Sequence, residues 1–175
     1  MNMRIREMKS YSIVLLAVLL LLMSKTDVPA ETAQTIKWKE VGYAKNIQLA
    51  EVPDFKGHIV GMFERRGLNI FEDGTVAVYK QMGSMDGWET GATCQGYTEL
   101  SFEDGSTIIY KFQGSEETKP GEMPRLKGEG TFIKGTGRFS GINGTLRFTG
   151  KYYTSLDDDN KGAAICEVVA TYTLP

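Results

Sequence analysis

The chain has 175 residues, with 20 basic and 22 acidic side chains, one histidine and a formal net charge of −2. Residues 31–175 alone hold 16 basic and 20 acidic residues, because residues 1–30 contain four basic residues and two acids. A mildly acidic chain without a basic run is a poor candidate for binding nucleic acid or an anionic membrane surface, since neutralisation of phosphates dominates both affinities.

Residues 1–30 have the organisation of a secretory signal peptide. A basic start precedes an uncharged run over residues 11–23, and small side chains follow at Val28 and Ala30. We expect cleavage after Ala30, which makes the mature protein secreted or periplasmic. The alternative is an uncleaved anchor, but thirteen apolar residues fall short of the ~20 that span a bilayer as a helix. No stable membrane span is expected after cleavage.

Residues 31–175 suit one domain and show no sustained helical period. Short runs rich in Val, Ile, Thr, Tyr and Phe alternate with turn residues, which is typical of an all-β domain. We predict a single closed or nearly closed antiparallel β-barrel of about eight strands, since closure removes exposed edges. The expected strands are 35–43, 57–64, 67–72, 75–81, 94–103, 106–113, 128–134, 144–154 and 163–173.

Two similar turns and three loops connect these strands. Asp-Gly occurs in both Phe71–Thr75 and Phe102–Ser106, and this dipeptide favours a tight type I′ turn with two positive φ angles. The residues 82–93, 114–127 and 157–162 are predicted to be loops. The last of these is acidic, but Lys161 stands where an EF-hand calcium loop needs a ligand, so a polar turn is favoured.

Alternation at period two assigns the inward side chains. It places Tyr110, Tyr152 and Tyr172 inside the barrel, and with Trp88 of the loop 82–93 they are the candidate contacts for a small ligand. The alternative is a barrel that is simply filled by these rings. Small barrels of about eight strands occur in both forms.

The two cysteines, Cys94 and Cys166, fall on inward faces of their strands. In an exported protein they are expected to form a disulfide, and two buried free thiols are the alternative. Two cysteines and one histidine do not suffice for a structural zinc site, so no metal is predicted.

No catalytic residue and no cofactor can be assigned from the sequence. Any triad would have to use His58, which precedes an apolar strand and is better explained as a residue at a strand end. Asn143-Gly144-Thr145 fits the acceptor pattern for N-glycosylation and matters only if the source modifies exported proteins in this way.

A glycine-rich segment over residues 135–150 resembles that of the allene oxide cyclase and dirigent-protein barrels and their small secreted bacterial relatives. Its key positions are Gly135, Gly137, Phe139, Gly141 and Gly144. The glycines allow sharp bends between strands, and we expect Phe139 to plug the barrel end. The resemblance implies an eight-stranded, calycin-like barrel with a mostly apolar cavity, as a homodimer or homotrimer. The charged cavity residues of those families cannot be placed on this chain.

Three functions remain open. The first is a secreted barrel that binds a small, largely apolar molecule. The second is a cofactor-free isomerase or cyclase of the allene oxide cyclase type, which needs a polar group inside the barrel, with Glu64, Glu99 or a tyrosine as candidates. The third is a structural or oligomeric envelope protein with a filled core and no ligand.

Overall fold

The computed structural model describes residues 32–156 and 161–175, so the predicted signal peptide and most of the acidic turn lie outside the described residues. The described part is almost entirely β-structure, as predicted, with one short 3₁₀ turn, η1 (Gly137–Phe139). The described residues contain no helix with the length and hydropathy needed to cross a bilayer. The strands are β1 (Gln34–Glu51), β2 (Ile59–Phe71), β3 (Val76–Trp88), β4 (Gly91–Phe102), β5 (Thr107–Glu117), β6 (Arg125–Gly135), β7 (Asn143–Tyr152) and β8 (Ala164–Thr173).

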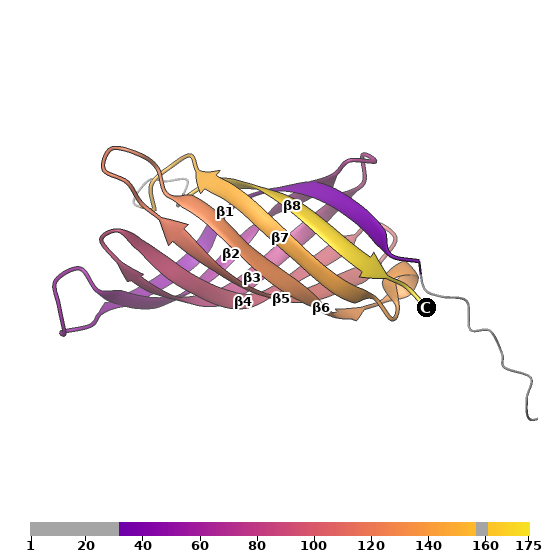
Figure 1. Ribbon diagram of the computed structural model, residues 1–175, viewed down its shortest axis with the longest axis horizontal. Helices are drawn as coiled ribbons and strands as arrows, with labels where there is room; N and C mark the ends of the chain where they lie inside the picture. The colour runs from indigo at the N-terminus through magenta and orange to yellow at the C-terminus, as the bar shows by residue number, and fades with distance from the viewer. Residues whose placement is uncertain (1–31, 157–160) are drawn as a thin grey trace, which may run out of the picture. The chain divides into compact units, whose positions relative to one another are not determined.

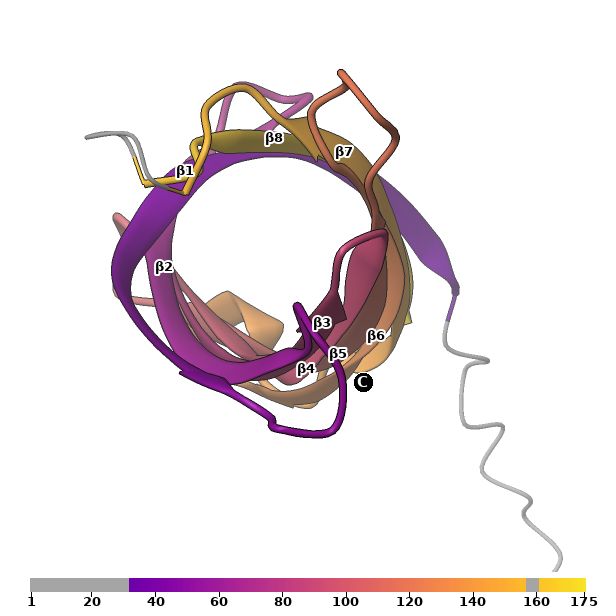
Figure 2. The ribbon, with the colours of Figure 1, turned by 90° about the vertical axis from the view of Figure 1, so that its left-hand side faces the viewer.

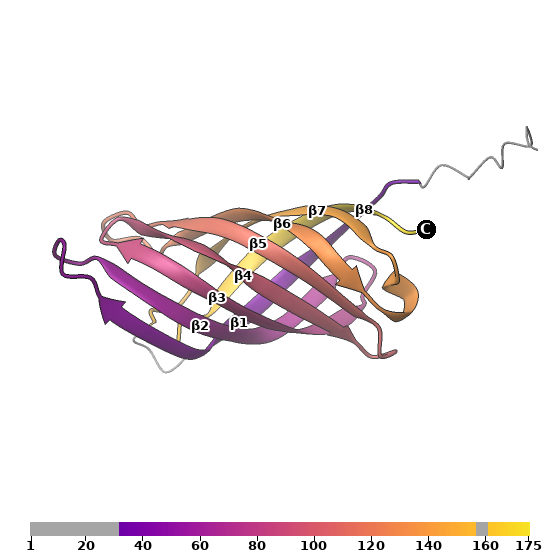
Figure 3. The ribbon, with the colours of Figure 1, turned by 90° about the horizontal axis from the view of Figure 1, so that it is seen from below.

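Each strand pairs antiparallel with its neighbours in the sequence, and β8 returns to pair with β1. This confirms the closed eight-stranded barrel. The view along the barrel in Figure 2 shows β8 beside β1, and Figures 1 and 3 show the strands inclined to the long axis. Closure leaves no unpaired sheet edge, which is the physical advantage that favoured a barrel from the sequence.

Two predicted strands, 57–64 and 67–72, are one continuous strand, β2. The predicted break fell on Arg65 and Arg66, which are paired with β1 and β3 like the rest of the strand. In the barrel, period-two alternation directs these neighbours to opposite faces. Arg66 lies outside and pairs with Glu64, whereas Arg65 is buried inside the barrel.

The loop predicted over residues 82–93 is also wrong. β3 continues to Trp88 and β4 begins at Gly91, so only two residues connect the strands. The glycines that suggested a loop, such as Gly83, belong to paired strand positions. A Cβ atom at Gly83 would collide with the main chain at Gln95 and the ring of Phe63, so glycine is needed there for close packing inside the barrel.

The two Asp-Gly turns are tight hairpins, but of a different type from the prediction. Gly74 and Gly105 have φ angles of 84° and 80°, whereas Asp73 and Asp104 are not among the described residues with positive φ. The amide of Gly74 donates to the carbonyl of Phe71, as in a type I turn followed by a glycine bulge. Asp73 accepts a hydrogen bond from the amide of Thr75, which explains why aspartate precedes the glycine.

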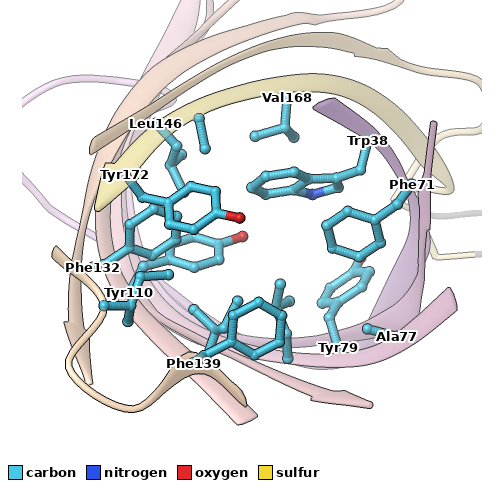
Figure 4. Packing of buried hydrophobic residues seen from close by; sticks show 14 of the residues in the cluster. Trp38, Phe71, Ala77, Tyr79, Tyr110, Phe132, Phe139, Leu146, Val168 and Tyr172 are labelled. Carbon is cyan, nitrogen blue, oxygen red and sulfur yellow. The ribbon is translucent and has the colours of Figure 1, made fainter. Parts of the chain in front are cut away.

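The two ends of the barrel differ. The end that holds the start of β1, η1 and the C-terminus is filled by aromatic rings, which Figure 4 shows converging on the interior. Phe139 of the glycine-rich segment is buried there, with its ring centroid 4.8 Å from that of Phe102. Only about 10 Å³ of space remains among these side chains, counted as the volume open to the centre of a water molecule. The buried residues of this plug include Trp38, Phe71, Leu100, Phe102, Ile108, Phe132, Phe139, Ile142 and Tyr172.

The glycines of the segment 135–150 shape this end. Gly137 and Gly141 have φ angles of 59° and 79°, which favour glycine. A Cβ at Gly135 would collide with the main chain of Phe139. The segment therefore turns sharply and directs Phe139 into the plug.

Candidate functional site

A cavity of about 70 Å³, in the same measure, occupies the barrel interior toward the other end. The connections β1–β2, β3–β4, β5–β6 and β7–β8 lie at that end (Figure 1). One water molecule needs roughly 10–15 Å³ in this measure, so the cavity has room for a small organic group. Its apolar lining includes Ile47, Phe63, Met85, Phe112, Leu126, Leu146, Phe148, Leu156 and Val168, and its polar lining includes Glu40, Arg65, Tyr79, Gln81, Tyr110, Glu116 and Tyr152.

Three polar side chains of this lining form a chain across the interior. The hydroxyl of Tyr152 donates to Oε1 of Glu116 at 2.7 Å, and Nη1 of Arg65 lies 3.5 Å from the same hydroxyl oxygen. The Arg65 guanidinium also lies over the Tyr152 ring, 5.3 Å from its centroid. Strands β2, β5 and β7 therefore supply a linked cation, phenol and carboxyl group.

Main-chain carbonyls hold Arg65 in place. Its Nη2 donates to the carbonyl oxygens of Gly42, at 3.3 Å, and Gly162, at 3.2 Å. The side chain is nine-tenths buried, and a buried guanidinium is tolerated only where hydrogen bonds compensate for lost hydration. These bonds tie the inner face of β2 to β1 and to the segment that precedes β8.

A second carboxyl group, Glu40 of β1, lies deeper in the barrel. It accepts a hydrogen bond of 3.2 Å from the hydroxyl of Tyr110. Its cross-strand neighbour Asn69 is fully buried, and the side-chain amide of Asn69 has no hydrogen-bond partner among the described residues. Unpaired polar atoms therefore lie close to the carboxyl group of Glu40.

Burial controls the protonation of both carboxyl groups. Desolvation raises the pKa of Glu40, although the nearby charge of Arg65 and the hydrogen bond from Tyr110 act in the opposite direction. Desolvation likewise raises the pKa of Glu116 against the effects of Tyr152 and Arg65. Each carboxyl group therefore holds its proton to a higher pH than a solvated glutamate, which suits groups that exchange protons with a ligand.

The close approach of Tyr79 to this cluster depends on a glycine. A Cβ atom at Gly42 would collide with the Tyr79 hydroxyl and with the main-chain oxygen of Arg66. Glycine at this inward position of β1 therefore creates the space that the Tyr79 hydroxyl occupies. Desolvation raises the pKa of Tyr79 far above its usual value, so the phenol is neutral and remains a hydrogen-bond donor.

Of the four aromatic residues predicted from the sequence as ligand contacts, two line the cavity and two do not. Tyr110 and Tyr152 line the cavity. Tyr172 does not, because it belongs to the plug, where its hydroxyl donates to Gln34. Trp88 is also not part of the lining, because it ends β3 with 42% of its surface exposed. The loop that was predicted to carry Trp88 is replaced by strand β3 and a connection of two residues.

The cysteines do not form the predicted disulfide. Both line the cavity, and both are free thiols. Strands β4 and β8 lie four positions apart in a ring of eight, so Cys94 and Cys166 project from opposite walls. Desolvation raises the pKa of Cys94 to about 11 and that of Cys166 to about 12, which leaves both thiols protonated and poorly reactive.

The carboxyl groups expected inside the barrel are also different ones. Glu64 is ion-paired with Arg66 on the outer face, and Glu99 is exposed on β4. The inward carboxyl groups are Glu40 and Glu116. Glu40 could have been found, since it shares its face of the alternating segment 35–43 with Trp38.

His58 is not among the residues that line the cavity, and it links the β1–β2 connection to the end of β3. Its Nδ1 lies 2.7 Å from a carboxylate oxygen of Asp54, and its Nε2 lies 2.8 Å from Asp86 at the end of β3. The ring of Phe55 stacks on the imidazole at 4.8 Å. The hydrogen bonds that the imidazole donates to Asp54 and Asp86 raise the pKa of His58. His58 therefore forms a hydrogen-bonded bridge between Asp54 and Asp86 at the surface.

Comparisons with known proteins place the fold but not the function. No family model matches the sequence, and no curated protein does. Among solved structures, the pterocarpan synthase dirigent protein GePTS1 matches with a TM-score of 0.44 and 19% identity, over 87% of this chain and 96% of that chain. The pterocarpan synthase dirigent protein PsPTS1 matches with a TM-score of 0.43 and 16% identity, over 82% and 96%.

A conserved protein of unknown function from Rhodopseudomonas palustris matches with a TM-score of 0.50 and 8% identity, over 82% of this chain and 99% of that chain. Likeness at such identities shows the fold alone. The closed eight-stranded antiparallel barrel that the resemblance of residues 135–150 implied is confirmed. The chemistry of the cavity has to be argued from this chain's own residues.

Proposed function

We propose that the protein binds a small, largely apolar molecule inside its barrel. The observation that supports this proposal is the cavity at one end of a barrel whose other end is filled. Ligand sites are typically concave, mostly apolar and provided with a few polar groups that orient the ligand. The rings of Phe63, Phe112 and Phe148 meet the first condition, and the cluster around Arg65 meets the second.

Binding is tested by blocking the cavity from within. The dye ANS and a panel of small lipophilic compounds are titrated into the purified protein by fluorescence and calorimetry. We expect saturable binding to the wild type, loss of binding in Cys94→Phe, and full binding in Thr93→Phe, which places the same ring on the outer face. Chemical-shift mapping on the wild type should locate the ligand against the lining residues. No saturable binding of any compound, or shifts confined to the outer face, would refute the proposal.

A cofactor-free isomerase or cyclase is the second candidate, because the cavity contains groups able to move protons. Glu40 with Tyr110, and Glu116 with Tyr152, are buried carboxyl–phenol pairs beside one guanidinium. Such groups support acid–base chemistry on a positioned substrate. A bound ketone should exchange its α-hydrogens with deuterated solvent faster in the wild type than in Glu40→Gln, with binding unchanged. Equal exchange in both proteins would leave binding as the function.

We also propose that the protein is exported and loses residues 1–30. The support is the basic start, apolar run and small residues before Glu31. Expression of the full chain in a bacterium, followed by intact-mass analysis of each cell fraction, should find a species that begins at Glu31 outside the cytoplasm. A full-length product in the cytoplasm or membrane would contradict export.

A further inference from the structure

The cavity contains more hydrogen-bond acceptors than its own donors satisfy. An ionised carboxylate has two oxygens and about four acceptor sites. Glu40 receives one hydrogen bond, from Tyr110, and Glu116 receives one, from Tyr152. Within the described residues, no cationic nitrogen lies within 4.0 Å of either carboxyl group. Each carboxyl group therefore has acceptor sites that the described chain does not use.

Arg65 does not supply the missing partners. Its hydrogen bonds go to neutral oxygens, namely the carbonyls of Gly42 and Gly162 and the hydroxyls of Tyr152 and Tyr79. Main-chain bonds on two sides hold the guanidinium against the wall, so it acts on the carboxyl groups only from a distance. With both carboxyl groups ionised, two negative charges face one positive charge, and the cavity lacks one cation.

The rings of the cavity wall are suited to surround a cation. Phe112 lies 6.5 Å from Phe63 and 6.5 Å from Phe148 between ring centroids, so rings from the non-adjacent strands β2, β5 and β7 meet inside the barrel. Aromatic faces attract ammonium groups, and more strongly when the group is desolvated. The same rings provide the apolar surface that the body of a ligand requires.

We propose that the ligand of this cavity is a small organic ammonium compound, whose protonated amine binds one of the two carboxylates, Glu40 or Glu116, while its apolar body packs on the rings. The inference rests on the proposed binding function and specifies its ligand class. An ammonium group supplies the three donors and the single positive charge that the cavity lacks. A carboxylate ligand would add a third negative charge beside two unpaired carboxyl groups.

Three probes with one apolar body test this ligand class. Phenethylamine, phenethyl alcohol and hydrocinnamate carry a cation, a neutral hydroxyl and an anion on similar frames. Calorimetric titration of the purified protein at pH 7.5 should give an affinity for phenethylamine at least about tenfold above that of the other two. Equal or tighter binding of the alcohol or the acid would overturn the inference and leave the binding function intact. Failure of all three probes and of the lipophilic panel would overturn both.

Variants locate the amine. We expect Glu116→Gln or Glu40→Gln, whichever removes the carboxylate that binds the amine, to weaken phenethylamine binding about tenfold and to leave binding of the alcohol unchanged, since only the charge is removed. Glu117→Gln is the matched control, because Glu117 follows Glu116 but is exposed on the outer face. An unchanged amine affinity in both cavity variants would refute the assignment. If a variant does not fold, the comparison of the three probes on the wild type still decides the matter.

A pH series adds an independent readout. Glu40 is faced by Arg65, Tyr79, Tyr110 and Cys166, and Glu116 by Arg65, Tyr152 and Cys94. Among these groups only the two carboxyl groups take up protons as the pH falls into the acidic range, and burial raises the pKa of both. Phenethylamine affinity should fall as the pH decreases and the carboxylates are protonated, whereas the alcohol should bind equally throughout. A pH-independent amine affinity would contradict the inference.

Discussion

At the end that holds η1 and the C-terminus, the barrel interior is packed with rings, whereas the interior toward the other end holds two carboxyl groups, a guanidinium and a cavity. Both regions are built from the same eight strands with the same inward alternation. The filled region gains stability from apolar burial, and the polar region loses some of it to desolvated charges. The comparison teaches that a single closed sheet can separate the residues that stabilise it from those that serve a ligand.

The largest expected effect concerns the plug. Phe139→Ala removes a buried ring that contacts Phe102, and it should lower the free energy of unfolding by about 3–5 kcal/mol. Urea denaturation gives this value, and calorimetric titration should show little change in ligand affinity. The exposed Tyr97→Ala on β4 is the control and should cost far less. A loss of affinity as large as the loss of stability would show that the two regions are not separable.

Arg65→Met tests the polar region. Removal of the cation leaves Glu40 and Glu116 without a nearby positive charge, so we expect a loss on the order of 3 kcal/mol at pH 7. Because burial raises the pKa of both carboxyl groups, they take up protons at a higher pH than solvated glutamates, and the loss should shrink as the pH falls. Urea melts at pH 7 and pH 4.5 measure both values. Arg66→Met on the outer face should show neither effect, and a loss that did not depend on pH would contradict the electrostatic explanation.

Gly42→Ala should lower the free energy of unfolding by less than Arg65→Met does, because it displaces side chains of the polar cluster without removing a charge. The added methyl group would displace the Tyr79 hydroxyl and press on the main chain of β2, with a cost of about 1–3 kcal/mol. Gly87→Ala is the matched control, since its methyl group would meet its nearest neighbours at 3.3 Å or more. Thermal melts compare the two. Equal stability of both variants would show that the space at Gly42 is not used.

The smallest expected effect is at the surface bridge of His58. Hydrogen bonds to Asp54 and Asp86 raise its pKa above 6.5, so the bridge stabilises the protein most below that pH and loses its effect as the pH rises through the raised value. An NMR titration of the imidazole should give the raised pKa, and Asp86→Asn should lower it. A pKa at or below 6.5 in the wild type would mean that the bridge does not form in solution.

Alternation and turn residues sufficed to predict the barrel, because a closed sheet repeats one local rule around the ring. The same rule placed Tyr110 and Tyr152 inside. For Tyr172 the rule gave the correct face of the strand but not the position along the barrel axis. The side chain points inward, but the sequence does not indicate which end of the barrel is filled by side chains. The position of a side chain along the barrel axis depends on the inclination and register of the strands, and both are set by pairings between residues that are distant in the sequence.

The polar cluster was missed for a different reason. Arg65 interrupts an apolar face, and a charged residue beside Arg66 and Gly67 predicts a turn more readily than a buried strand. Glu116 lies near a strand end that was assigned to a loop. Residues that oppose the hydrophobic pattern are difficult to place from the pattern itself, and functional residues are often of this kind.

The pairing of β1 with β8 has a consequence for biosynthesis. The first strand finds one of its two partners only when residues 164–173 have been made, so the ring cannot close on a growing chain. Until then two edges, on β1 and β7, remain free to pair with other polypeptides. Loss of the C-terminal strand should therefore yield aggregates rather than a seven-stranded remnant.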